Sequence, residues 1–583
     1  MGWTVLSNGV TEQVGDGRWQ AAPTPLLSTC LIAVAAGPWH AVRTEHRGVP
    51  FGWYCRRSMA PYLDADELFE ITRQCFDRYH EKFDEPYPFD SYDQAFVPEF
   101  NTLAMENPGL VTFAEERLFR SAVTDTAAAL LNFDGISYAR GASALRQLVA
   151  WLGEKDFLAG INTHFARHKY ANATLADFID SLATSTQRDV HAWADSWLRT
   201  TGVDTLTPAV TPGDNGTYAL TVGHAGDRPH RVAVGLYDRD LGDDEGRLAL
   251  RERLDIDVPQ TGAQPIGERP ALLLLNEGDL TYAKVRFDPG SLDTVHKSLA
   301  GLPDPLTRAV VWNALRDGEL AAAAYLETAL AHLPHETDPA IVQGVLAFAS
   351  AHIADRYLPA DERPAALNTL SALCSDLIHR TGGDNPGLRL IAVRHFIDVA
   401  AHSGTIAGWL TDGTVPGGPE LRWRILARLA VLGAADEAAI AAELRRDPSA
   451  TGQEGAARCR AALLDEEAKA KAWEAMFATD AGNDLSNYLF TATAQGFWQP
   501  EQLDLLLTYV PRYYPDAIAL AARRGPAIAK AAAKHAFPIH AINAETLRLG
   551  QECLSNGAPT PMLRRGLADQ LDDLARALRV RER

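Results

Sequence analysis

The pattern of apolar and polar positions changes twice along this chain of 583 residues. Up to about residue 200, short apolar runs alternate with segments that repeat at helical spacing. From Thr201 to about residue 290, apolar and polar residues alternate, which is typical of strands. Beyond Leu299, Ala-rich segments of helical spacing continue to the C-terminus. This order, in a chain too long for a single core, predicts an α+β protein of several domains.

Strands and helices are mixed in the first 200 residues. Val5, Trp19 and the run Leu26 to Ala36 predict two or three strands before about Arg47. A helix is predicted between Tyr62 and Phe83, with Asp64 as its N-cap. Its apolar positions recur at helical spacing: Leu68, Ile71, Cys75, Phe76 and Tyr79. A second helix is predicted to open at Tyr138, with a buried stripe made by Leu145, Leu148, Val149 and Leu152.

The alternating region predicts a small β-sandwich of about 90 residues. Its apolar runs are Tyr218 to Val222, Val232 to Leu236, Leu254 to Val258 and Ala271 to Leu275. The C-terminal region predicts amphipathic helices whose pairs recur loosely, as in a HEAT-like stack. Examples are Val311 to Leu333, Leu388 to Ala400, Leu421 to Leu432 and Leu567 to Val580.

The stretch Phe96 to Phe113, FVPEFNTLAMENPGLVTF, contains the main candidate for function. A strand-like segment leads into Ala104-Met105-Glu106-Asn107, and Pro108-Gly109 turns the chain into a second apolar run. This pattern places a carboxylate, Glu106, at the end of a strand.

The stretch resembles the GAMEN signature of the M1 zinc aminopeptidases, the aminopeptidase N family. In that family the Glu binds the free α-amine of a peptide, and the strand edge pairs with the peptide backbone. The resemblance implies that Ala104, Met105, Glu106 and Asn107 bind substrate, although Leu103 stands where the family has Gly. Tyr138, in GISYARG, matches the family Tyr that stabilises the oxyanion.

Two further stretches carry the same resemblance. Residues Phe157 to Gly202 match the part that closes the family's catalytic domain, and Pro270 to Asp288 look like the strand pair before its last domain. The implied domains are a remnant of the N-terminal β-domain (1–47), a truncated thermolysin-like catalytic domain (48–200), the β-sandwich (201–290) and an α-helical superhelical domain (291–583).

The zinc-binding motif of the family does not occur in this sequence. In the family, HExxH and a Glu eighteen residues later lie between the signature and the Tyr. Here only 31 residues separate Glu106 from Tyr138, and none is His. We therefore expect no metal ligands and no cofactor from this chain, and no ordinary aminopeptidase turnover. The sequence around Thr126 to Leu130 reads as an excision, and both a natural loss and a deletion remain open.

Other catalytic patterns are weak. His164 and His168, in HFARH, have i, i+4 spacing but lack the Glu and a third ligand, which favours a surface pair. His335-Glu336 follows Pro334 in a loop and is a poor ligand pair. No GxSxG, GxxxxGK[ST] or GxGxxG fingerprint occurs, which disfavours serine hydrolases and nucleotide-binding proteins.

Charge and cysteine content restrict the partners and the compartment. The chain has 55 basic and 75 acidic residues, so a net charge of −20 disfavours nucleic acid and anionic membranes as partners. Six scattered cysteines without a CxxC pair predict reduced, buried thiols. The run Leu26 to Ala36 is too short to span a bilayer and follows no basic segment, so we expect a cytoplasmic protein.

Three functional hypotheses follow. The first is an aminopeptidase N-like protein, resembling enzymes that release N-terminal amino acids from peptides, but inactive because it lacks the zinc ligands. The second is a protein that binds peptides with a free N-terminus, or a scaffold, using a helical bowl. The third is a non-hydrolytic enzyme that reuses the emptied cavity with Tyr138 and Glu106 as acid and base. The sequence indicates no oligomeric state.

Overall fold

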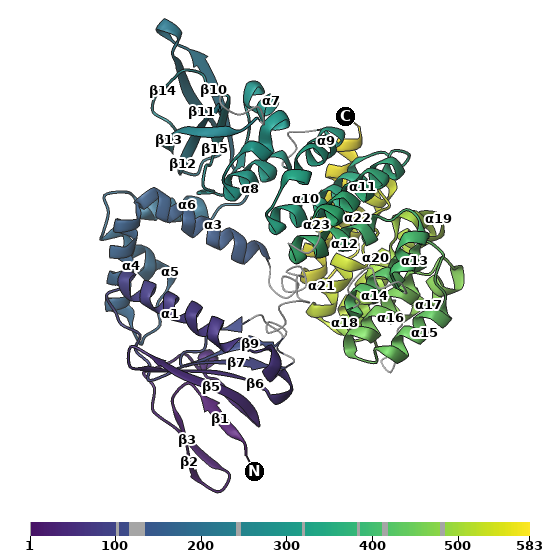
Figure 1. Ribbon diagram of the computed structural model, residues 1–583, viewed down its shortest axis with the longest axis horizontal. Coiled ribbons are helices and arrows are strands. Elements are labelled where there is room, and N and C mark those ends of the chain that lie inside the picture. The colour runs from purple at the N-terminus through teal and green to yellow at the C-terminus, as the bar shows by residue number, and fades with distance from the viewer. Residues whose placement is uncertain are drawn as a thin grey trace. The chain divides into compact units, whose positions relative to one another are not determined.

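The computed structural model describes residues 2–98, 100, 104–115, 135–240, 246–316, 321–381, 385–410, 418–477 and 484–582, without the side chains of 135–140 and 215. The chain divides into two units (Figure 1). Unit 1 contains Met1–Asp238 and Leu250–Ser291, and unit 2 contains Arg239–Ala249 and Leu292–Arg583. Each unit is described by itself.

Four short strands begin unit 1. Strand β1 (Thr4–Ser7) pairs antiparallel with β4 (Val34–Gly37), and β2 (Thr11–Gly15) pairs with β3 (Arg18–Ala21). The prediction of a strand over Leu26 to Ala36 is wrong for most of that run, because Thr29–Leu31 form a 3₁₀ turn (η1) and only Val34 onward is extended. Pro23 and Pro25 precede the turn, and proline cannot donate to a strand ladder.

A five-stranded sheet forms the centre of this part of unit 1. Its order is β5-β6-β7-β9-β8, with β5 and β8 at the edges. The bounds are β5 (Trp39–His46), β6 (Val49–Arg56), β7 (Tyr92–Val97), β8 (Ala104–Met105) and β9 (Leu110–Ala114). Strands β6, β7 and β9 are parallel, whereas β5 and β8 pair antiparallel with their neighbours.

The two faces of the sheet are covered differently. Helix α1 (Ala65–Lys82) connects β6 to β7 and packs on one face, where Phe51 of β6 lies 4.8 Å from Phe76 of α1, ring centroid to ring centroid. On the other face, Leu6 of β1 packs with Tyr54 and Leu110. Parallel strands need such a crossover helix, and the aromatic side chains of β6 fill both layers.

The predicted start of α1 is confirmed. The side chain of Asp64 accepts a hydrogen bond from the Glu67 backbone at 3.1 Å, as an N-cap residue does. The predicted apolar stripe is only partly buried, because Ile71 and Tyr79 are more than half exposed.

Four helices complete the segment before the β-rich region: α3 (Gly135–Leu152), α4 (Glu154–His168), α5 (Leu175–Ala183) and α6 (Val190–Leu198). Their common core includes Leu148, Leu182 and Trp193. The prediction that Leu145 belongs to a buried stripe is wrong, since this side chain is 47% exposed.

Strands β10 to β16 occupy the region where alternation predicts strands. One sheet has the order β14-β11-β10-β16 and a second has the order β13-β12-β15. The bounds are β10 (Thr205–Pro212), β11 (Tyr218–Ala225), β12 (His230–Arg239), β13 (Leu248–Val258), β14 (Gln264–Gly267), β15 (Leu272–Leu275) and β16 (Lys284–Val285). All four predicted apolar runs lie on strands of this set. Whether the sheets form a sandwich stays a prediction.

After β16, the described residues form helices. They are α7 (Pro289–Ser298), α8 (Pro305–Ala314), α9 (Ala322–His332), α10 (Pro339–Phe348), the π-helical η8 (Ala349–Tyr357), α11 (Arg363–Thr381), α12 (Pro386–Val399), α13 (Ser403–Trp409), α14 (Pro419–Val431), α15 (Glu437–Arg446), α16 (Ala450–Ala462), α17 (Glu466–Phe477), α18 (Asn487–Phe497), α19 (Leu503–Leu506), α20 (Val510–Arg524), α21 (Pro526–His535), α22 (Ala544–Asn556) and α23 (Pro561–Arg581). Three of the four C-terminal helices predicted by residue range are confirmed, as α12, α14 and α23.

The predicted single helix Val311 to Leu333 is wrong, because α8 ends at Ala314 and α9 begins at Ala322. Apolar periodicity continues across both helices and hides the boundary. The dipeptide Asp317-Gly318 is a turn signal in the sequence between them.

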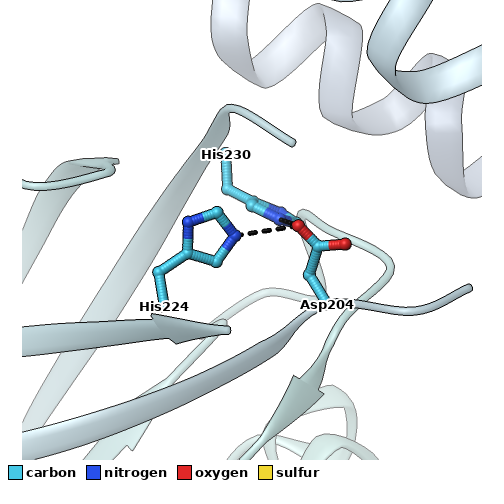
Figure 2. A group of neighbouring side chains, drawn as sticks. All are labelled: Asp204, His224 and His230. Atoms are coloured by element: carbon cyan, nitrogen blue, oxygen red, sulfur yellow. Dashed lines mark hydrogen bonds and ion pairs between the residues drawn. The ribbon is translucent and has the colours of Figure 1, made fainter. Parts of the chain in front are cut away.

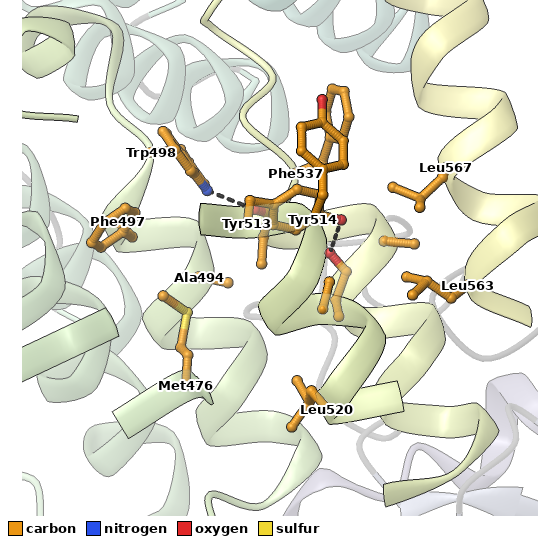
Figure 3. Packing of buried hydrophobic residues seen from close by; sticks show 14 of the residues in the cluster. Met476, Ala494, Phe497, Trp498, Tyr513, Tyr514, Leu520, Phe537, Leu563 and Leu567 are labelled. Atoms are coloured by element: carbon orange, nitrogen blue, oxygen red, sulfur yellow. Dashed lines mark hydrogen bonds between the residues drawn. The ribbon is translucent and has the colours of Figure 1, made fainter. Parts of the chain in front are cut away.

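A large aromatic core lies in unit 2 (Figure 3). Its buried rings are hydrogen-bonded at their polar ends: the Tyr513 hydroxyl donates to the Ala532 carbonyl at 3.1 Å, and the Tyr514 hydroxyl donates to that of Thr546 at 2.7 Å. The Trp498 indole donates to the Ala536 carbonyl at 2.7 Å. These bonds allow large amphipathic rings to be buried without an unpaired polar atom.

Two smaller predictions concern cysteines and membranes. Cys55, Cys374, Cys459 and Cys553 are buried thiols as predicted, but the prediction is wrong for Cys30 and Cys75, which are exposed. In the described part of the chain, no helix is both long and apolar enough to cross a bilayer.

The β7 residue Asp93 gives a test of the sheet. Burial raises the pKa of its carboxyl to about 6, against the opposing charge of Arg43. Because the folded pKa lies above the ordinary value of 3.8, Asp93 favours the folded state at low pH, and this contribution is lost as the pH rises from about 4 to about 6. We expect Asp93→Asn to gain up to about 3 kcal/mol in unfolding free energy relative to the unchanged chain between pH 4 and pH 7.

The measurement is urea unfolding at several pH values, with hydrogen exchange of the β7 amides as the local readout. Asp16→Asn, in the exposed turn between β2 and β3, is the control and should show no such pH-dependent difference. Parallel pH curves for Asp93→Asn and the unchanged chain would contradict the assignment.

Candidate functional site

The AMEN segment, Ala104 to Asn107, lies at an edge of the five-stranded sheet. Its first two residues form β8, which pairs antiparallel with β9 through Ala104 opposite Phe113 and Met105 opposite Thr112. On its other side β8 has no strand partner among the described residues. An edge strand presents unpaired backbone N–H and C=O groups, which can pair with an extended peptide.

Glu106 follows the edge strand directly and is exposed. Within the described part of the chain, no hydrogen bond or ion pair engages its carboxylate. A solvated carboxylate at the end of an unpaired strand edge is therefore available to a cation that arrives with an extended chain. The structure thus agrees with the predicted position of Glu106, whereas its role is not tested.

Asn107 faces inward instead. Its side chain is only 4% exposed. The Nδ2 group donates to the Leu31 carbonyl at 3.0 Å, and Oδ1 accepts from the Thr112 hydroxyl at 3.1 Å. These bonds hold the turn after β8. Through them Asn107 fixes the backbone next to Glu106.

The Pro108-Gly109 turn is fixed by the N-terminal segment. Gly109 has φ +76°, and a Cβ atom at this position would lie 1.9 Å from the Asn8 carbonyl oxygen. The Asn8 side chain donates from Nδ2 to the carbonyls of Pro108, at 2.7 Å, and Leu31, at 2.9 Å. Only glycine allows this close approach, so the turn requires glycine for both its conformation and its packing.

The far end of β9 is held by an ion pair. Arg56, the last residue of β6, donates from Nε and Nη2 to the two carboxylate oxygens of Glu115 at 2.6 and 2.5 Å. This two-pronged contact, with a buried carboxylate, ties β9 to β6 across β7. The register of β8 depends on β9. Strand β9 is held by the Gly109 turn at one end and by the Arg56–Glu115 ion pair at the other.

Two predicted positions lie outside what the structure describes. Tyr138 belongs to helix α3, but its side chain is outside the described residues, and so are residues 101–103, which include Leu103. The structure brings Ala104, Met105, Glu106 and Asn107 together and does not test whether the Tyr138 hydroxyl joins them.

Sequence reasoning missed the residues that support this site. Asn8, Leu31 and Thr112 hold the AMEN turn, and the contact between Asn8 and Pro108 spans 100 positions of sequence. No local pattern marks such a contact. The one local signal is the turn dipeptide Pro108-Gly109. It predicts a turn but does not show which residue packs against the glycine.

The described residues around Glu106 do not fit the catalytic zinc ion that the resemblance implies. One group of three His, Cys, Asp or Glu side chains there has the geometry to hold a metal, and it consists of Asp204, His224 and His230. None of these lies on β8, β9 or α3. The region around Glu106 therefore offers no described set of three ligands for a catalytic metal.

The two other histidine patterns also lack a metal geometry. His164 and His168 lie one turn apart at the C-terminal end of α4, with ring centroids 4.9 Å apart, and they belong to no three-residue group among the described side chains. The Glu336 carboxylate accepts from Nε and Nη2 of Arg308, both at 2.8 Å. It is thus part of a buried ion pair.

A large cavity of unit 1 lies elsewhere. It has a volume of about 940 Å³, and its lining combines aliphatic and aromatic side chains, among them Leu26, Tyr79 of α1, and Phe165 of α4. No AMEN residue contributes to its lining. We therefore assign the candidate site to the strand edge, where the charged group is, and not to this apolar cavity.

Comparison with protein families identifies two known domains. The model of the peptidase family M1 domain matches residues 67–131 and 119–197. The model of the ERAP1-like C-terminal domain matches residues 272–576, which is more than half of the chain.

Individual relatives agree with these domains. An aminopeptidase N of Streptomyces lividans is 34% identical over 700 aligned positions, which cover 99% of this chain and 80% of the relative. A glutamyl aminopeptidase of Mus musculus is 22% identical and covers 51% of this chain and 41% of its own length. An aminopeptidase 2 of Candida albicans is 23% identical, in an alignment that covers 31% of this chain and 29% of the relative.

Two details of these comparisons concern how continuously the chain matches. The two matches to the M1 domain overlap at residues 119–131, so the family model is matched in two separate pieces. The alignment with the Streptomyces lividans protein has 700 positions against 583 residues here, so at least 117 residues of that relative (700 minus 583) have no counterpart in this chain.

The glycine turn beside Glu106 gives a matched test. Ala at position 109 would suffer both the cost of a left-handed conformation, about 1–2 kcal/mol, and overlap with the Asn8 carbonyl. Gly48, in the turn between β5 and β6, has φ +79° but no heavy atom within 4 Å of a built Cβ. We expect Gly109→Ala to lower the unfolding free energy by about 1–3 kcal/mol more than Gly48→Ala. Urea unfolding compares them, and equal losses would show that the Asn8 contact does not constrain the turn.

Proposed function

This chain belongs to the M1 peptidase family and is aminopeptidase N-like over nearly its whole length, and from this membership we propose that it is a family member that does not hydrolyse peptides. One observation carries the proposal. The 31 residues between Glu106 and Tyr138 contain no His, whereas the family's HExxH and distal Glu stand between the corresponding residues.

Peptide hydrolysis by this family depends on an activated water nucleophile. A zinc peptidase holds its metal with three protein ligands, keeps one position for water and adds a general base. The metal lowers the pKa of the bound water from about 15.7 to about 7. Among the described residues, the strand edge offers a carboxylate and backbone amides, which can bind and orient a peptide but leave water a poor nucleophile.

The comparisons support a loss of sequence at this place. The family model matches in two pieces that meet at residues 119–131, between Glu106 and Tyr138. In addition, the Streptomyces lividans relative has more than a hundred residues without a counterpart here. A lost segment at this junction would remove all zinc ligands at once.

The proposal is tested by turnover of aminoacyl chromogenic substrates. We expect no chelator-sensitive release of the chromophore, with or without added Zn²⁺, because no described residues near Glu106 form a three-ligand metal site. The Streptomyces lividans relative serves as the positive control under the same conditions. Saturable turnover that EDTA abolishes and Zn²⁺ restores would refute the proposal.

A second function is favoured by the geometry of the strand edge. We propose that the chain binds peptides that have a free N-terminus, with an extended peptide pairing along β8 and its ammonium group meeting the Glu106 carboxylate. The observations behind this are the unpartnered side of β8 and the exposure of Glu106 directly beyond it, both among the described residues. Backbone pairing would supply affinity without side-chain selectivity.

Charge recognition at this edge is modest. An ion pair between solvated groups contributes about 0.2–1 kcal/mol, so Glu106 alone gives at most about a fivefold preference for a free amine over a blocked one. The binding experiment must therefore resolve a difference of a few fold. A larger preference for the free amine would require a second hydrogen-bond acceptor for the ammonium group.

Fluorescence anisotropy with a labelled peptide tests this second function. We expect the free-amine peptide to bind about two- to fivefold more tightly than its N-acetylated form, and Glu106→Gln to remove that preference. Glu45→Gln is the matched control, because Glu45 is also exposed and lies on β5, the opposite edge strand. No binding at all, or an equal effect of both variants, would contradict it.

We propose that β10 to β16 form a β-sandwich, that the helices of unit 2 stack as a HEAT-like superhelix, and that the protein is cytoplasmic. The order of the two family matches, the M1 domain and then the ERAP1-like C-terminal domain, supports the proposed architecture. The six scattered cysteines, with no CxxC pair, agree with a reducing compartment. A non-hydrolytic enzyme using Tyr138 and Glu106 has no described geometry in its favour, since the Tyr138 side chain is outside the described residues.

A further inference from the structure

Three side chains converge where the β-rich part of unit 1 begins (Figure 2). Asp204 directly precedes β10, His224 is in β11, and His230 is the first residue of β12. The antiparallel register places Leu206 of β10 opposite His224, and the turn after β11 returns the chain to His230. Residues 20 and 26 positions beyond Asp204 are thereby brought to one carboxylate.

The ligand-type atoms of these residues face one another. The Nε2 atom of His224 lies 2.8 Å, and that of His230 lies 3.3 Å, from Oδ2 of Asp204. All three atoms lie within 4.8 Å of one another. Zinc bonds of about 2.0–2.2 Å place the ligands of a tetrahedral site roughly 3.3–3.5 Å apart. The two distances between a histidine nitrogen and Asp204 Oδ2 therefore differ from this spacing by less than about 1 Å.

We propose that Asp204, His224 and His230 bind a divalent transition-metal ion of the Zn²⁺ class. Two imidazole nitrogens and one carboxylate oxygen are a donor set that suits Zn²⁺ and disfavours Ca²⁺ and Mg²⁺, which prefer oxygen ligands. Three protein ligands leave the fourth position for water.

The surroundings of His230 resemble those of a metal-binding imidazole. Its Nδ1 lies 2.7 Å from the Thr281 hydroxyl. The backbone N–H of Thr281 donates to Oδ1 of Asn276 at 2.9 Å, which fixes the position of the threonine. In the metal-free protein, Nε2–H of His230 donates to Asp204. When an ion takes the place of that proton, Nδ1 can carry the proton and donate it to the Thr281 hydroxyl, and such outer partners orient most histidine ligands.

Burial protects the cluster from competing water. The side chain of His230 is fully buried, that of Asp204 is 3% exposed and that of His224 is 9% exposed. The Trp197 ring packs edge-on against His230, with 5.1 Å between centroids. Gly226 closes over the carboxylate, because a Cβ there would lie 2.2 Å from Cγ of Asp204. The glycine thus allows the backbone to pack directly against the Asp204 carboxylate. His224 is the most exposed of the three side chains, so an ion would reach the cluster from its side.

Arg228 is the group that opposes a cation here. Its Nη1 pairs with Oδ1 of Asp204, and its backbone N–H donates to Oδ2 at 2.9 Å. The guanidinium is also held away from Oδ2, because Nη2 donates to the Thr200 hydroxyl at 2.8 Å and to the Thr201 carbonyl at 3.0 Å. It therefore leaves Oδ2 to the histidines, while its charge reduces the affinity for a dication.

The protonation states at neutral pH agree with this use. Burial raises the pKa of Asp204, but hydrogen bonds from His224, Arg228 and His230 outweigh it and lower the pKa to about 2. Burial lowers the pKa of His230 to about 4, although Asp204 opposes this. An ionised carboxylate and a neutral imidazole are the forms that ligate metals.

The test is a Zn²⁺ titration of the full chain after chelator treatment, read by isothermal titration calorimetry, with Co²⁺ absorption as a second readout. We expect one ion per chain. His224→Gln and His230→Gln each keep a hydrogen-bond donor but lose the ring nitrogen, and each should weaken binding by more than about 100-fold, whereas Thr281→Val, which removes an outer partner, should weaken it about 10-fold.

His164→Gln is the matched control, because it breaks the other close histidine pair of unit 1 and should leave the affinity unchanged. Circular dichroism checks the fold of each variant, and the partly exposed His224 decides the question if His230→Gln is unfolded. No stoichiometric binding, or full affinity in His224→Gln, would show that the cluster is only a buried ion-pair network around Arg228. Since the readout is binding and not hydrolysis, the result is independent of the proposed lack of peptidase activity.

Discussion

The close approach of the Asn8 carbonyl to Gly109 is the contact on which the candidate site depends. This contact fixes the turn that follows Glu106. The turn then sets the register of the two-residue strand β8 on β9. A strand of two residues has too few ladder bonds to hold its own register. The N-terminal segment therefore determines where the carboxylate points, although Asn8 and Pro108 lie 100 positions apart in sequence.

This arrangement separates binding from chemistry. Backbone groups of an edge strand and a solvated carboxylate can hold an extended chain, and both are fixed by contacts with Asn8, Leu31 and Thr112. Hydrolysis requires a metal cation that lowers the pKa of bound water. The ligands of that cation would have to come from other segments. A family member can thus lose one capacity while the frame of the other persists.

The residues that the sequence placed correctly depend on local chemistry, and those that it misplaced depend on distant neighbours. The Asp64 N-cap, the strands around Leu220 and Val234, and the helices α12, α14 and α23 follow from side-chain type and spacing, as does the position of Glu106 beyond a strand. Periodicity marks an apolar face, but only the neighbouring element decides whether Ile71 or Leu145 becomes buried. Continuous apolar spacing likewise concealed the boundary between α8 and α9. The contacts of Asn8 and the cluster at Asp204 join residues from separate strands, so no sequence window contains them.

The Asp204 cluster also changes how metal content is interpreted in this family member. Its ligand atoms come from the ends of β10, β11 and β12, whereas Glu106 follows β8 on a different sheet. A metal ion held there would be coordinated by side chains that have no described contact with the strand edge. Zinc bound at this cluster would therefore be no evidence for peptide hydrolysis at the strand edge.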